Sequence, residues 1–260
     1  MRHRLASLVI VTTGLLLAVT TATGQAPAYR APRTGDGKPN LNGIWQALNT
    51  ANWDIQAHSS APGLISDLGA SNAVPGGMGV VEGEIPYKPE ALAKKKENYA
   101  NRLKLDPENK CYLPGVPRAT YMPYPFQILQ SQKHIMILHE FVGAVRTIYM
   151  DNATEAPADS WMGWSNGRWE GEALVVDTSG FNDKSWLTIQ GHPHTEAMHV
   201  TERISRPDLG HLNIEFTIED KETYKTPWVI QRVADLNTTD EVGEYVCAEG
   251  EKDAPHLVGK

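Results

Sequence analysis

Residues 211–220 read HLNIEFTIED, and apolar and polar side chains alternate along the segment from Leu212 to Glu219. A period of two residues is typical of a β-strand with one buried face and one face in water. The segment therefore predicts a half-buried antiparallel strand. Its apolar members share one face of an extended chain: Leu212, Ile214, Phe216 and Ile218.

Further strand candidates flank this segment, and short turns such as Val142-Gly143 separate many of them, as in an antiparallel meander. Segment 227–236 places Arg232 on the same face as Trp228 and Ile230, which predicts a barrel interior that is not purely apolar. The predicted strands are 43–45, 126–130, 134–141, 144–150, 168–178, 196–205, 211–219, 227–236 and 243–247.

A meander of eight or more strands usually closes to remove its edges, and a closed barrel of that size holds one small ligand. Gly43-x-Trp45 opens the first predicted strand and resembles the signature of lipocalin and wider calycin barrels, where the Trp closes one end. We therefore predict an all-β fold: an antiparallel up-and-down, calycin-like barrel with a long irregular N-terminal insertion and one short helix. The ending (YVC at 245–247, LVGK at 257–260) resembles a group of secreted soil-bacterial proteins without an established activity.

Residues 1–24 have the parts of a secretory signal peptide: Arg2 and Arg4, an apolar run over 5–19, and small residues at 22–24. An uncleaved anchor is the alternative, but the run is shorter than the ~20 residues that a span needs. We therefore expect a secreted or periplasmic protein with no membrane association after cleavage. Cleavage takes the net charge from −7 to −9, since the leader carries those two arginines and no acid, and this disfavours nucleic acid as a partner.

The remaining chain divides into a linker or arm at 25–40 and a single barrel domain at 41–260. Within that domain, residues 49–125 form the insertion, and Pro89 opens a predicted helix over 89–103. Cys111 and Cys247 are the two cysteines, and an oxidising compartment favours a disulfide between them. Two buried free thiols, or one catalytic thiol, are the alternatives.

Segment 192–202 holds the densest group of chemically active side chains. His194 or His199 is the candidate general base, with Glu202 or Asp177 as its carboxylate partner. Strand parity separates His199 from Glu202, because residues three apart face opposite sides of a strand. A loop whose histidines bond to the backbone is the alternative.

A metal site is a further hypothesis for the same segment. In an extended chain His192, His194 and Glu196 share one face, and two imidazoles with one carboxylate suit a divalent metal. The spacing resembles the His-x-His core of cupin metal sites, although the carboxylate follows more closely here. No other cofactor is expected, since phosphate-loop, nucleophile-elbow, zincin and c-type haem motifs are absent from the sequence.

Aromatic residues predict a pocket for a flat or apolar small molecule, with core packing as the alternative. Arg146 is a candidate buried partner of Asp177 or Glu202. The leading hypothesis is a small-molecule binder; the alternatives are a cofactor-independent lyase, isomerase or hydrolase, and then a metal-dependent enzyme. The candidate ligand-binding residues are Trp161, Trp164, Trp186, Trp228, Tyr124 and Arg146.

Overall fold

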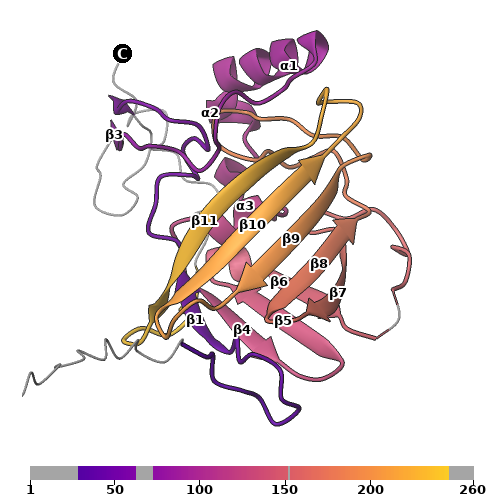
Figure 1. The fold of residues 1–260 in the computed structure, drawn as a ribbon. Helices are drawn as coiled ribbons and strands as arrows, with labels where there is room; N and C mark the ends of the chain where they lie inside the picture. The colour runs from indigo at the N-terminus through magenta and orange to yellow at the C-terminus, as the bar shows by residue number, and fades with distance from the viewer. Residues whose placement is uncertain (1–28, 63–72, 152, 246–260) are drawn as a thin grey trace, which may run out of the picture.

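The computed structural model describes residues 29–62, 73–151 and 153–245, and a closed nine-strand barrel forms its centre (Figure 1). The predicted all-β, calycin-like barrel is confirmed. The sheet order is β1-β11-β10-β9-β8-β7-β6-β5-β4, and β1 closes it. The strands are β1 (Gly43–Gln46), β4 (Phe126–Gln130), β5 (His134–His139), β6 (Val145–Tyr149), β7 (Trp164–Glu170), β8 (Ala173–Ser179), β9 (His199–Ser205), β10 (His211–Glu219) and β11 (Trp228–Asn237).

Sequence neighbours are sheet neighbours from β4 to β11, and β1 pairs antiparallel with both β4 and β11. One pair of the described barrel strands, β6 with β7, is parallel, with Ile148 beside Ser165. Residues 150–163 carry the chain back between these two strands. The up-and-down order is therefore interrupted once.

Two predicted strands were wrong. Segment 168–178 is a hairpin: β7 ends at Glu170 and β8 begins at Ala173, around a turn in which Gly171 has a φ of +61°. Glycine adopts this left-handed conformation without the steric cost that a side chain adds, so Gly171 marks the turn. Residues 243–245 form no strand, and the end of that predicted strand lies outside the described residues.

The described chain between β1 and β4 forms helices, turns and a small sheet, and α1 and α2 lie over one mouth of the barrel (Figure 1). The single helix predicted at 89–103 is wrong in its end, because α1 stops before Asn101, which has a non-helical φ of −108°. The minor elements are β2 (Ala61–Pro62), β3 (Ala73–Val74), α1 (Pro89–Ala100), α2 (Arg102–Leu105), η1 (Glu108–Lys110), α3 (Arg118–Tyr121) and η2 (Phe141–Gly143).

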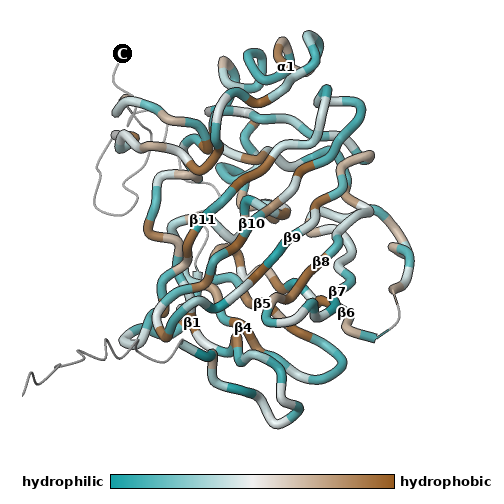
Figure 2. The backbone as a smooth tube through the Cα atoms, in the orientation of Figure 1, coloured by the Kyte–Doolittle hydropathy of each residue, from teal (hydrophilic) through white to brown (hydrophobic). Residues whose placement is uncertain are grey.

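The barrel interior follows the predicted alternation. Hydropathy alternates along β10 and β11 (Figure 2), and the four apolar residues of β10 are at most 2% exposed. On β11, Val229 and Val233 point outward and are exposed, while Ile230 and Ala234 are buried. Burial of this apolar face supplies the main driving force for folding.

Trp45 lies on β1, at the end of the barrel away from α1 (Figure 1). Its side chain is fully buried, and its Nε1 donates to the Leu41 carbonyl at 3.0 Å. The Arg206 guanidinium lies 5.1 Å from the Trp45 ring and donates to the carbonyls of Asn40 and Leu209 at 2.8 and 2.7 Å. Gly43 permits this packing, since a Cβ there would lie 2.9 Å from Leu236 Cδ1.

Several sequence predictions concern residues outside the described ranges. The leader lies there, and so does Cys247, so the signal peptide and the Cys111–Cys247 disulfide stay predictions. Among the described residues, no helix is both long and apolar enough to cross a membrane. The division into an arm and an inserted segment likewise stays a prediction.

Arg206→Ala tests how far the stability of the barrel depends on the contacts of Arg206 with Trp45, Asn40 and Leu209. Loss of two buried hydrogen bonds and the stacking on Trp45 should lower the free energy of unfolding by about 2–3 kcal/mol, measured by urea denaturation. Arg203→Ala is the matched control, since Arg203 lies on the same stretch of chain but is exposed and pairs with exposed Glu170. Equal losses in the two variants would contradict the assigned role of Arg206.

Candidate functional site

Six polar side chains point into the barrel from different strands, and all are less than 6% exposed. The inward face of each strand brings them together, because alternate residues face the interior. We call this set the interior polar band: His139 (β5), Arg146 (β6), Ser165 (β7), Thr178 (β8), Glu202 (β9) and Arg232 (β11).

Arg146 and Glu202 form a buried bidentate ion pair. Arg146 Nη1 donates to Glu202 Oε1 at 3.0 Å, and Nη2 donates to Oε2. The remaining donors reach Ser165 Oγ at 2.9 Å and Thr178 Oγ1 at 2.8 Å. Of the two partners predicted for Arg146, Glu202 is the one it contacts. The charges of the pair offset each other within the interior.

Arg232 is buried without such a partner. Its side chain is 5% exposed, and none of its three guanidinium nitrogens makes a hydrogen bond with the described residues. The guanidinium lies 5.6 Å from the Phe126 ring centre and 5.9 Å from that of Phe216. Burial lowers the pKa of Arg232 to about 9, while the Glu202 charge acts in the opposite direction. Arg232 is therefore still a cation at neutral pH.

Two more unpaired polar groups lie near the mouth covered by the helices. Neither ring nitrogen of His139 meets hydrogen-bond geometry in the described residues, although the Ala119 backbone lies near the ring. Burial, together with the charges of Arg146 and Arg232, lowers the pKa of His139 to about 3, so the ring is neutral. Trp228 Nε1 also has no partner there.

The described residues between β1 and β4, together with the loop between β8 and β9, are called the cap here, and His192 joins these two parts. Its ring is fully buried; Nδ1 accepts from the Tyr87 hydroxyl, and Nε2 lies 3.3 Å from Asp54 Oδ1. Burial lowers the pKa of His192 to about 4 despite the Asp54 carboxylate. For Asp54, burial raises the pKa, but the contact with His192, the hydrogen bond from the Gln56 N–H and the charge of Lys95 together outweigh it and lower the pKa. A neutral His192 therefore donates from Nε2 to an ionised Asp54.

His194, a predicted general base, pairs with a residue that the sequence analysis missed. Ser185 Oγ lies 2.7 Å from His194 Nε2, and His194 Nδ1 lies 3.1 Å from the Thr195 carbonyl. A hydroxyl beside a neutral imidazole is the arrangement that activates a serine. Ser185 and His194 are only 3% and 4% exposed, however, and burial lowers the pKa of His194. In this geometry the pair fixes the loop between β8 and β9.

The other predicted catalytic residues are separated by the wall of the barrel. Glu202 points inward to Arg146, whereas Asp177 and His199 lie on the outer face, 3.8 Å apart between Oδ1 and Nε2. Asp177 also pairs with Arg168. No predicted histidine therefore meets Glu202, since parity directs His199 to the opposite side of β9.

The predicted metal ligands do not converge. His192 bonds to Asp54 and His194 to Ser185, and Glu196 is exposed. Within residues 29–62, 73–151 and 153–245, no three His, Cys, Asp or Glu side chains gather as metal ligands. Residues 191–198 form no strand, and the chain turns at 196–197, so the assumed shared face of a strand does not form.

The predicted ligand-binding residues are also dispersed. Trp228 and Arg146 face the interior, and Trp186 is buried in the loop after β8. The others lie elsewhere: Trp161 beside Tyr112 at 5.3 Å, Trp164 stacked on Tyr149 at 4.3 Å, and Tyr124 beside Phe141 at 5.5 Å between ring centres.

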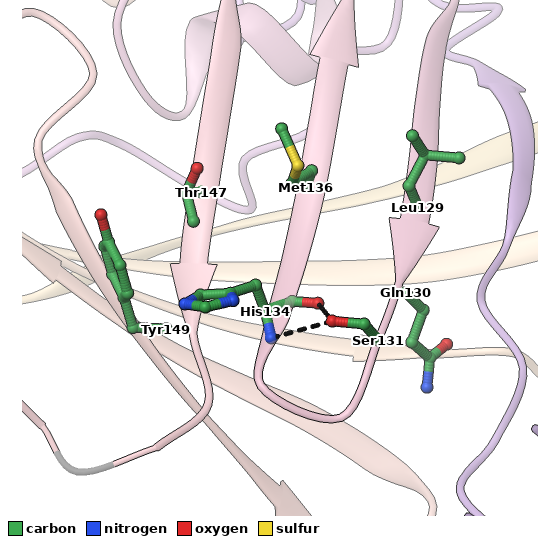
Figure 3. Close-up of a pocket in the computed structure, with 7 residues that line it drawn as sticks. All are labelled: Leu129, Gln130, Ser131, His134, Met136, Thr147 and Tyr149. Carbon is green, nitrogen blue, oxygen red and sulfur yellow. Dashed lines mark hydrogen bonds between the residues drawn. The ribbon is translucent and has the colours of Figure 1, made fainter.

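A pocket of about 420 Å³ lies on the outer face of β4, β5 and β6 (Figure 3). Leu129, Met136 and Thr147 lie in a row across its floor, and Tyr149 and His134 stand to one side. The Ser131 hydroxyl is occupied by the His134 backbone. The lining is uncharged and open to solvent, so this pocket offers a ligand fewer fixed polar groups than the interior does.

A scan against protein-family models and a search of curated proteins give no match to this chain. Neither comparison supports the resemblance to the soil-bacterial group.

Arg146→Met tests the buried ion pair. The single variant leaves Glu202 charged and unpaired, so we expect it to lower the free energy of unfolding by about 3–5 kcal/mol in urea denaturation. Arg146→Met combined with Glu202→Leu should recover most of that loss, because neither charge of the pair is then left without its partner. A double variant that loses as much as the single variant would contradict the assignment of the loss to the unpaired carboxylate.

His192→Gln tests the pH dependence of the cap. The folded-state pKa of His192 is lowered to about 4, so below pH 6.5 the unfolded chain binds the extra proton first. Stability contributed by the neutral ring is therefore present above pH 6.5 and is lost as the pH falls toward 4, by roughly 2–3 kcal/mol.

Denaturation of both proteins at several pH values between 4 and 7 measures the effect. The variant should show a flatter pH dependence than the wild type. His134→Gln is the control, since it makes the same substitution at an exposed ring outside the cap. Parallel pH profiles for wild type and His192→Gln would rule out the assigned role.

Proposed function

We propose that this protein binds one small molecule with an apolar or aromatic body inside the barrel, after export to the periplasm or the medium. The observation that carries the proposal is the set of unpaired polar groups in the interior: the Arg232 guanidinium, the His139 ring and the Trp228 indole N–H. Buried polar groups are nearly always hydrogen-bonded, and each unmet one costs about 1–3 kcal/mol. A bound ligand would supply the missing partners.

The apolar groups around these donors suit a flat molecule. The Phe126 ring lies 5.7 Å from the His139 ring and 5.6 Å from the Arg232 guanidinium, so both unpaired groups border the same aromatic ring. Phe216 covers Arg232 from the neighbouring strand β10. Ligand sites are mostly apolar with a few placed polar groups, and this interior has that composition.

We expect a ligand to enter the barrel through the mouth that the cap covers. The three unpaired groups lie on β5 and β11, and β5 ends and β11 begins at the mouth beneath α1 and α2 (Figure 1). The loop between β8 and β9 joins this cap through His192, which contacts Tyr87 and Asp54. Movement of the cap would admit a ligand without breaking the sheet.

The geometry favours binding over catalysis. The predicted base His194 is occupied by Ser185 and the backbone, and the predicted carboxylate Glu202 is held by Arg146. The other candidate pair, His199 and Asp177, is on the outer face. An acid/base step needs both groups within reach of one substrate, and these residues do not share a space.

A ligand screen tests the proposal. Small aromatic and aliphatic compounds, whether neutral, cationic or anionic, are titrated while intrinsic tryptophan fluorescence and melting temperature are recorded. At least one class should bind saturably at one molecule per chain, and at 100 times its Kd it should stabilise the fold by about 2.7 kcal/mol.

Two tryptophan variants locate the bound molecule. Trp228→Phe should remove most of the ligand-induced fluorescence change, because Trp228 faces the interior. Trp164→Phe, on the outer face beside Tyr149, should leave it intact. If no class binds, or if the signal depends on Trp164 and not on Trp228, interior binding is rejected.

A further inference from the structure

We propose that the interior ligand is a monocarboxylate, and that Arg232 binds its carboxylate group. This inference rests on the proposed function and specifies the chemical class of the ligand. It depends on the pairing of the buried arginines, on the charge balance of the interior, and on the donors around Arg232.

Arg232 differs from the other buried arginines of the described chain. Arg118 donates to both oxygens of Asp106 at 3.0 and 3.2 Å, and also to Asn52 and Glu108. Arg146 has Glu202, and Arg206 has two carbonyls and a tryptophan ring. Each of these three guanidiniums therefore has at least two hydrogen-bond partners, although Arg206 Nε has none. Arg232 differs because none of its three nitrogens has a partner among the described residues.

The charges inside the barrel require one anion. Arg146 and Glu202 offset each other, and His139 is neutral, so Arg232 leaves the interior polar band with one net positive charge. An unpaired buried charge is strongly unfavourable, because neither solvent nor a counter-charge stabilises it. A monoanion matches this charge, whereas a dianion would leave a negative charge in the same surroundings.

The available donors fit a carboxylate. All three nitrogens of Arg232 are free of hydrogen bonds with described residues, so two parallel N–H groups can meet the two carboxylate oxygens. The Phe126 and Phe216 rings flank the guanidinium and provide apolar contacts for the body of the ligand. His139 and Trp228 can each donate one further hydrogen bond.

The test compares each carboxylate with its own primary amide: benzoate with benzamide, phenylacetate with phenylacetamide, and hexanoate with hexanamide. Within a pair the shape is nearly constant and the charge differs. We expect at least one carboxylate to bind about 30-fold more tightly than its amide, as a charge-assisted hydrogen-bonded pair predicts. Sodium chloride and inorganic phosphate, titrated separately, should not displace it at millimolar concentration.

Arg232→Met is the decisive variant. It should weaken carboxylate binding about 30-fold and leave amide binding within about 3-fold. It should also raise the melting temperature of the ligand-free protein, since it replaces an uncompensated buried charge with an apolar side chain. Arg203→Met, on the exposed face of β9, is the matched control and should leave both affinities unchanged.

The outcomes separate this inference from the proposed function. If carboxylates and amides bind equally, or Arg232→Met still binds the carboxylate, the barrel is a binding site but the carboxylate inference is wrong. If chloride or phosphate at millimolar concentration displaces the bound carboxylate, Arg232 is a site for inorganic anions and the inference again fails. If no compound of any class binds to the interior, both proposals fall.

Discussion

Closure of the barrel through β1 is the constraint on which the rest of the structure depends. By pairing with both β4 and β11, this four-residue strand satisfies the two sheet edges that would otherwise be open. Closure also fixes the inward or outward direction of every second side chain. Whether a polar residue faces water or a low-dielectric interior is therefore decided by its parity on a strand, and the chemistry of this protein follows from that.

Within the closed interior, two cations and one anion are buried together. Glu202 accepts both Arg146 donors, which leaves Arg232 without a carboxylate. The pKa of Arg232 is lowered, because burial disfavours the charged form more than the Glu202 carboxylate favours it. The interior thus combines a stable ion pair, which holds β6 to β9, with an unsatisfied cation that can interact with a ligand.

The cap has the opposite character, because its buried polar groups are satisfied. Arg118 joins Asp106 and Asn52, Tyr121 donates to the Leu187 carbonyl at 2.6 Å, and His192 joins Tyr87 and Asp54. These bonds connect segments far apart in the sequence into one cover. The described part of the cap is thus fully paired, whereas Arg232, His139 and Trp228 beneath it have polar atoms without partners among the described residues.

The sequence by itself determined the barrel and its strand periodicity, because these follow from local alternation and turn residues, whereas the expected place of Trp45 came from the resemblance of Gly43-x-Trp45 to calycin barrels. It also determined that His199 and Glu202 face opposite sides, since parity is a local property. Only the tertiary structure decided the partners: Asp54 meets His192 across 138 residues, and His139 and Arg232 share an interior through closure of the sheet. The register of the strands and the packing of distant segments set these contacts, and neither is encoded in the spacing of neighbouring residues.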